Sequence, residues 1–101
     1  MALSPEQYDS FKHSILRAAM ELQSRELVYT TEWYFDFPSH QLTVDGEPIE
    51  REYQIPTGWY GYDEADLDRL VTERVLTKTE EHLGDPLFLE RKVVYQVNGL
   101  G

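Results

Sequence analysis

A strict alternation of side-chain types between residues 27 and 37 constrains the fold more than any other feature of this chain. In the segment LVYTTEWYFDF, one set of alternate positions is apolar or aromatic apart from one threonine, whereas the other set includes Glu32 and Asp36. A period of two over eleven residues predicts a β-strand, because successive side chains of a strand point to opposite faces. We expect one face of this strand to pack on a core and the other to meet water.

The N-terminal segment predicts a helix over residues 5–24. Ser4 can cap this helix, Pro5 suits its first position, and Gln7 completes a capping box. Apolar side chains then recur at helical spacing: Tyr8, Phe11, Ile15, Ala18, Ala19 and Leu22. The helix is therefore expected to bury one face.

Two shorter strands are predicted after the first one. The sequence Pro38-Ser39-His40 is expected to break the first strand, and residues 41–44 form the second. Asp45-Gly46 is the strongest hairpin dipeptide in the chain, because both central residues of a type I′ turn need a positive φ. Residues 48–55 alternate again and predict a third strand, with Pro48 near its start typical of a strand edge or beginning.

The C-terminal third predicts a second helix and a last strand. The helix is expected from Asp63 to Leu83, with His82 in its last turn and Gly84 in the left-handed position just past its end. Its apolar stripe comprises Leu67, Leu70, Val71, Val75 and Leu83. The segment from Leu87 to about Val97 reads as the last strand.

These elements predict a single α+β domain over residues 1–101. Their order is α-β-β-β-α-β, and the simplest architecture is a four-stranded, mainly antiparallel sheet with two helices on one face. The other face of the sheet would stay open. The chain has no cysteine, which excludes a disulfide scaffold, a cysteine zinc site and a thiol nucleophile.

The net charge of −10 disfavours whole classes of partner. A phosphate backbone and an anionic membrane would both be repelled, so we expect neither direct nucleic-acid binding nor membrane binding. A basic protein surface would be attracted, and a charge of this size also keeps a small domain in solution. The N-terminus lacks a basic segment followed by an apolar one, and a cytoplasmic location is the expectation.

The negative charge is concentrated in residues 32–68. This window holds ten of the acidic residues and one basic residue, Arg51, together with eight of the thirteen aromatic residues. Both flanks are close to neutral. An acidic and aromatic-rich middle is the most distinctive pattern in the sequence.

The segment IPTGWYGYDEADLD closes this window and has several interpretations. A calcium loop of the EF-hand type is rejected, because Ala65 and Asp68 stand where an oxygen ligand and a glycine are needed. Asp63 can instead cap the second helix, with acidic residues in its first turn favoured by the helix dipole. The aromatic residues Trp59, Tyr60 and Tyr62 would either plug the core or form an exposed recognition loop.

No enzymatic chemistry is predicted. His13, His40 and His82 show no metal-ligand spacing, and neither a phosphate-binding glycine motif nor a zinc-protease motif occurs. A general base also needs a nucleophile within hydrogen-bond reach, which this sequence does not specify. We therefore expect no enzyme activity, no cofactor and no metal.

Two functional hypotheses remain open. In the first, the chain is an inhibitor or immunity-type module, a nucleic-acid mimic among them, whose acidic window faces a basic protein such as a nuclease or another nucleic-acid-binding protein. In the second, it is an assembly or chaperone-like protein that forms a homodimer through its open sheet face, which joint exposure of Tyr34, Phe88 and Val94 would support. The candidate contacts of the first hypothesis are Glu32, Tyr34, Asp36, Glu50, Glu52, Trp59, Tyr60, Asp63 and Asp66.

Overall fold

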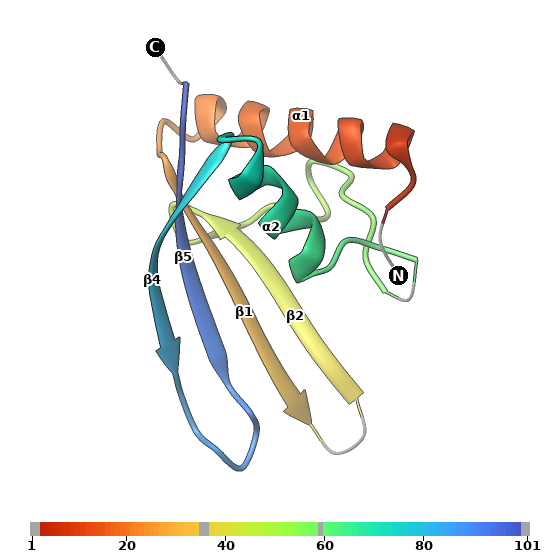
Figure 1. Cartoon of the computed structure of the whole chain (residues 1–101). Coiled ribbons are helices and arrows are strands. Elements are labelled where there is room, and N and C mark those ends of the chain that lie inside the picture. The colour runs from red at the N-terminus through yellow and green to blue at the C-terminus, as the bar shows by residue number, and fades with distance from the viewer. Residues whose placement is uncertain (1–2, 35–36, 59, 100–101) are drawn as a thin grey trace.

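A computed structural model describes residues 3–34, 37–58 and 60–99 of the chain. Two helices and five strands follow one another in the order α-β-β-β-α-β-β (Figure 1). Their bounds are α1 Pro5–Glu21, β1 Glu26–Tyr34, β2 Phe37–Val44, β3 Glu47–Pro48, α2 Glu64–Thr72, β4 Leu76–Leu83 and β5 Arg91–Val97.

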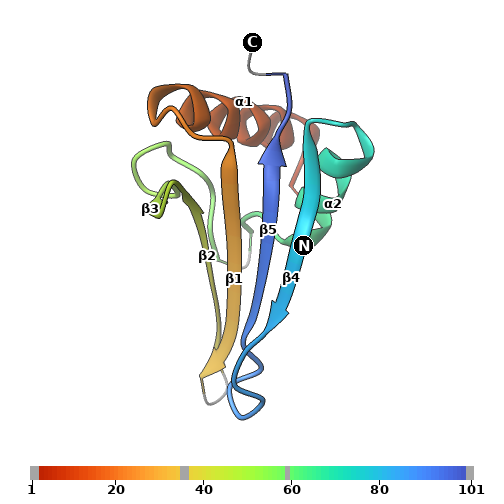
Figure 2. The ribbon, with the colours of Figure 1, turned by 90° about the vertical axis from the view of Figure 1, so that its left-hand side faces the viewer.

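The strands form one antiparallel sheet in the order β3-β2-β1-β5-β4. The predicted α+β class is confirmed, and the prediction of four strands is wrong, because the sheet has five. Strand β1 occupies the centre, between β2 and β5, and β3 and β4 are the outermost strands. Figure 2 shows the sheet from its uncovered side, with both helices behind it.

Helix α1 begins as the sequence predicts and ends earlier. The Ser4 hydroxyl accepts a hydrogen bond from the Gln7 backbone, and the Gln7 side chain accepts one from the Ser4 backbone, which completes the capping box. The helix ends at Glu21, three residues before the predicted end. Gln23 then takes a φ of 52°, which turns the chain into β1.

Helix α2 is much shorter than predicted, and the second half of the predicted helix is strand β4. Arg74 takes a φ of 64°, and the amide of Val75 donates to the Leu70 carbonyl, which closes the helix end. The threonine-rich segment that follows pairs with β5 instead. Leu83 is 81% exposed there, and Gly84, which no longer follows a helix, does not take a left-handed conformation.

The predicted third strand and the predicted break at Pro38 also need correction. Strand β3 stops at Pro48, and the chain then turns through residues 50–54, with Gln54 at a φ of 55°. Ile49 is nevertheless buried, as its alternation suggests. Pro38 lies within β2, where it pairs with Trp33. That part of β2 is a sheet edge, and an edge tolerates a residue without an N–H group.

The core lies between the helices and one face of the sheet. Tyr29 of β1 pairs with Leu42 of β2 and with Val93 of β5, and all three belong to the buried core cluster, which also includes residues of α1. The Asp45-Gly46 hairpin is confirmed by φ angles of 53° and 77°. The opposite face is polar over most of its area and carries Thr30, Gln41, Thr43, Lys92 and Gln96.

The sheet is longer than the layer of helices that covers it. The molecule measures 41 × 26 × 25 Å, and the β1–β2 and β4–β5 hairpins extend away from α1 (Figure 1). We call this end of the sheet, remote from α1, the distal end. Trp33 belongs to the face that packs on the core, yet it is 47% exposed.

Candidate functional site

A cavity of about 770 Å³ lies at the distal end of the sheet. Thr31, His40 and Arg91 contribute to it from β1, β2 and β5, and they share the face of the sheet that carries the core. We call this space the distal cavity. Its lining is completed by their strand neighbours and by Glu50, Thr57, His82, Leu83, Gly84 and Glu90.

Stacked aromatic rings form the boundary between the distal cavity and the core. The ring of Tyr62 lies 5.2 Å from Phe11 and 4.6 Å from His40, with both pairs nearly parallel. Tyr29 meets Tyr62 edge to face at 6.0 Å. Tyr62 is fully buried, so it is a core plug, whereas Tyr60 is 75% exposed. Tyr62 therefore fits the interpretation as a core plug, whereas recognition through the exposed Tyr60 stays a prediction.

Glu50 connects the loop before α2 to the edge of the sheet. Its carboxylate accepts hydrogen bonds from the backbone N–H of Leu42 and from the Tyr62 hydroxyl, the latter at 3.1 Å. Burial and the nearby Glu50 charge raise the pKa of Tyr62. The carboxylate thus takes the place of a neighbouring strand where β3 has already ended.

The side chain of His40 is half-buried, and its surroundings favour the neutral imidazole. Its Nδ1 atom lies 3.1 Å from the Tyr29 hydroxyl. Burial lowers the pKa of His40 and outweighs the opposing charges of Glu50 and Asp63, while burial raises the pKa of Tyr29 to about 12. Ser39 follows the alternation of β2 onto the opposite face, so the geometry does not pair its hydroxyl with His40.

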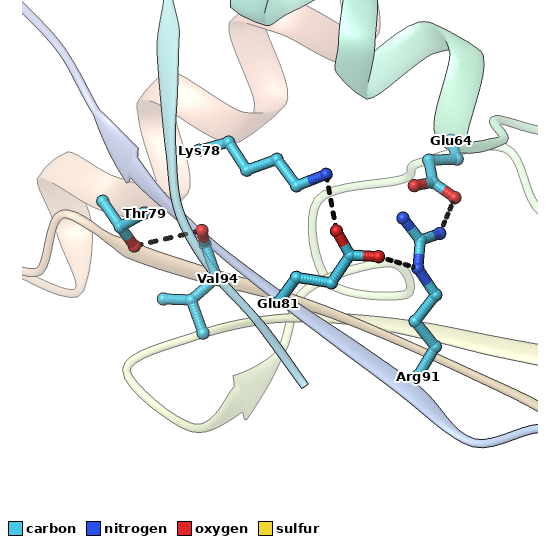
Figure 3. A network of polar contacts seen from close by, with 6 residues as sticks. All are labelled: Glu64, Lys78, Thr79, Glu81, Arg91 and Val94. Atoms are coloured by element: carbon cyan, nitrogen blue, oxygen red, sulfur yellow. Dashed lines mark hydrogen bonds and ion pairs between the residues drawn. The ribbon is translucent and has the colours of Figure 1, made fainter. Parts of the chain in front are cut away.

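Arg91 is the electrostatic centre of the cavity wall. Its guanidinium donates to Glu64 at the start of α2 and, at 2.6 Å, to Glu81 of β4, as Figure 3 shows. Lys78 lies 3.0 Å from the same Glu81. The hydrogen bond from Arg91, and then that from Lys78, lower the pKa of Glu81. This network ties α2 to the sheet and neutralises both cations.

Exposed apolar side chains gather beside the cavity. Six large apolar side chains among the described residues are strongly exposed, and four of them lie at the distal end: Trp33, Leu83, Leu87 and Leu89. The backbone N–H of Trp33 donates to the Phe88 carbonyl at 2.6 Å, which joins β1 to the loop between β4 and β5. We call these four side chains the apolar rim.

The structure disperses the contact residues that the sequence suggests. Glu32 and Glu50 both contribute to the lining of the distal cavity, and Glu52 and Tyr60 are exposed in the connection between β3 and α2. Tyr34 is the last residue of β1, and its side chain is not described. Asp36 and Trp59 lie outside the described residues.

Asp63 and Asp66 form the capping box of α2. The Asp63 carboxylate accepts from the Asp66 amide, and the Asp66 carboxylate accepts from the Asp63 amide at 3.0 Å and from the Leu3 amide at 3.4 Å. Asp66 is only 3% exposed, and its burial raises its pKa. Its oxygens are therefore engaged inside the fold.

Sequence reasoning missed Arg91 and the apolar rim. The segment LFLE contains apolar residues next to the Gly-Asp-Pro turn, which favours an exposed hairpin end over the start of a buried strand. That signal could have located Leu87 and Leu89. The partners of Arg91 come from α2 and β4, and no local pattern specifies them.

Comparisons with known proteins leave the function open. No protein-family model, curated protein or solved structure matches this chain. Within residues 3–34, 37–58 and 60–99, no group of three His, Asp or Glu side chains could hold a metal ion. In the same ranges, no helix is long and apolar enough to cross a membrane.

Proposed function

We propose that this chain is a small acidic protein-binding module, of the inhibitor or immunity type, that binds a basic protein surface. One observation carries the proposal: among the described residues, four of the six strongly exposed apolar side chains gather at one end of a molecule with net charge −10. Exposed apolar side chains that cluster mark interaction surfaces. The surrounding negative charge speeds the approach of a basic partner and selects it.

The proposal moves the contact surface toward the distal end of the sheet. Glu32 remains a contact because it lies in β1 beside the cavity, and Glu52 and Tyr60 remain exposed in the adjoining connection. Asp63 and Asp66 contribute negative potential from the helix start, since their side chains are committed to the cap. A nucleic-acid-binding protein such as a nuclease is one partner class of this kind.

The homodimer alternative has less support. The uncovered sheet face in Figure 2 is where it would form, but Val94 is only 7% exposed and most of its neighbours there are polar. Light scattering separates the two hypotheses: a dimer that survives high salt would favour self-association over the binding of a basic partner.

Affinity capture from a cell lysate tests the proposed function. The immobilised protein should retain basic proteins at low salt and release them as ionic strength rises to about 0.5 M, because salt screens exposed charges. A Leu87→Ser/Leu89→Ser variant should lose this capture. Met20→Ser is the matched control, since Met20 is 66% exposed on α1, away from the rim.

Capture that is equal in the rim variant and in wild type would contradict the proposal. Capture that does not change with salt would contradict it as well, because the negative charge would then have no part in the binding. Far-UV circular dichroism of both variants checks that the fold is intact.

A further inference from the structure

We propose that the distal cavity and its apolar rim bind an extended segment of a partner protein, in which a cationic side chain enters the cavity and apolar side chains two positions away pack on the rim. This inference rests on the proposed function and specifies the chemistry of the bound segment. The cavity volume of about 770 Å³ is sufficient for several side chains, since ligand pockets usually measure about 300–1,000 Å³.

The charges around the cavity select a cationic group. The lining side chains on this face and the Arg91 network together contain four carboxylates and two cations, a net charge of −2: Glu50, Glu64, Glu81 and Glu90 against Lys78 and Arg91. Both cations are engaged by Glu64 and Glu81.

The carboxylates of Glu50 and Glu90 have no cationic partner among the described residues. They accept hydrogen bonds from neutral groups, Glu90 from the Asp85 amide at 2.9 Å and Glu50 from Leu42 and Tyr62. A guanidinium or ammonium group in the cavity would complement them. A second copy of this chain, also at −10, would add repulsion at the same place.

The edges of the sheet disfavour the pairing of an extra backbone strand, so the partner segment is expected to bind through its side chains. On the β2 edge, the backbone N–H of Leu42 donates to Glu50 and its carbonyl accepts from Ile49, so both groups are occupied. Pro38 in the same strand has no N–H to offer. The other edge strand, β4, carries Lys78, Glu80, Glu81 and His82 and is interrupted by a bulge. Charges and bulges of this kind discourage the addition of a further strand.

The apolar rim supplies the second half of the recognition. Leu83 belongs to both the rim and the cavity lining, so the apolar and acidic surfaces are continuous. Trp33, on the same face of the sheet, extends the rim across β1. Alternate side chains of an extended segment point to the same side, so a cationic and an apolar side chain two positions apart would meet both surfaces at once.

A titration of the ¹⁵N-labelled protein with short synthetic peptides tests this inference. The probe is Ac-Leu-Ser-Arg-Ser-Leu-NH₂, in which both leucines and the arginine lie on one side of the extended chain, and the matched controls replace either the arginine by glutamate or both leucines by serine. The leucine–arginine peptide should produce saturable amide shifts at Thr31, His40, Leu83 and Glu90. The glutamate peptide should produce none, and the serine peptide should bind more weakly.

Variants of the protein separate the two contributions. Glu90→Gln keeps an oxygen that can accept from the Asp85 amide and removes the charge, and it should weaken binding about threefold, as expected for loss of one partly exposed ion pair. Leu83→Ser should weaken binding through the rim. Met20→Ser should leave the titration unchanged.

The outcomes distinguish this inference from the proposed function. Three outcomes would overturn the inference. They are amide shifts at acidic residues far from the cavity, equal binding of the glutamate peptide, and the absence of amide shifts at the cavity. If salt-sensitive lysate capture persisted in that case, the proposed function would stand without it. If the lysate capture also failed, both this inference and the proposed function would be refuted.

Discussion

Replacement of Glu50 tests whether this residue stabilises the fold or is a free acidic contact. In Glu50→Ala, the backbone N–H of Leu42 and the hydroxyl of Tyr62 lose their acceptor, and both residues are fully buried. A buried donor without a partner costs about 1–3 kcal/mol. We therefore expect the free energy of unfolding to fall by about 2–4 kcal/mol.

Glu52→Ala is the matched control for this substitution. Glu52 is exposed two residues away and makes no hydrogen bond or ion pair with any described residue. Its replacement should change the free energy of unfolding by no more than about 0.5 kcal/mol. The two substitutions remove the same charge, so a general effect of net charge would affect both equally.

Urea denaturation followed by far-UV circular dichroism measures the difference. With a slope of about 1–3 kcal/mol per molar for a domain of this size, Glu50→Ala should lower the midpoint by about 1–3 M. A double-mutant cycle with Tyr62→Phe should give a coupling of about 0.5–3 kcal/mol between the two side chains. If Glu50→Ala were as stable as Glu52→Ala, the structural role of Glu50 would be refuted.

Three further predictions concern other parts of the fold. Tyr95→Phe should leave the urea midpoint unchanged or raise it, because the Tyr95 hydroxyl is buried without a hydrogen-bond partner among the described residues. A decrease of more than about 1 kcal/mol in the free energy of unfolding would contradict this. The lowered pKa of His40 means that the folded state favours neutral imidazole. The contribution of neutral His40 to stability is fully present above the unfolded-state pKa of about 6.5, and it is lost as pH falls from there through the folded-state pKa. When the pH is lowered from about 7.5 to 5.5, the urea midpoint should therefore decrease more in wild type than in His40→Gln. Arg74→Gly should raise the free energy of unfolding by up to about 1 kcal/mol, and the urea midpoint with it, because Arg74 ends α2 with a φ of 64° and a left-handed conformation costs a residue with a Cβ about 1–2 kcal/mol; a lower midpoint would contradict this.

Local signals in the sequence predict the elements that depend on neighbouring residues. The capping box of α1 involves residues three positions apart, and the Asp45-Gly46 turn needs only two positive φ angles. Asp63 was expected to cap α2, and it does so. Each of these features stabilises the backbone within a few residues, so the order of amino acids alone is sufficient to specify it.

The error in the predicted second helix arises from a competition that the sequence does not resolve. Residues 75–83 have apolar and polar positions that fit a helix, but Thr77 and Thr79 also suit a strand. The choice is made by β5, whose backbone pairs with β4 from Leu76 to Leu83. The prediction of the third strand is too long because the backbone pairing of β3 ends at Pro48. Beyond that residue, the side chain of Glu50 pairs with the edge of β2 in place of a backbone.

The candidate site shows the same division between local and long-range order. The sequence by itself determined the acidity of the chain, the α+β class, the central strand and the two helix starts, because these follow from composition, periodicity and short-range hydrogen bonds. Only the tertiary structure decided that Asp66 is buried, that Glu50 is engaged by Leu42 and Tyr62, and that Arg91 lies between Glu64 and Glu81. It also decided that the sheet extends past its helices and leaves the distal cavity and apolar rim uncovered. Those facts depend on contacts between segments far apart in the chain, and residue spacing carries no information about such contacts.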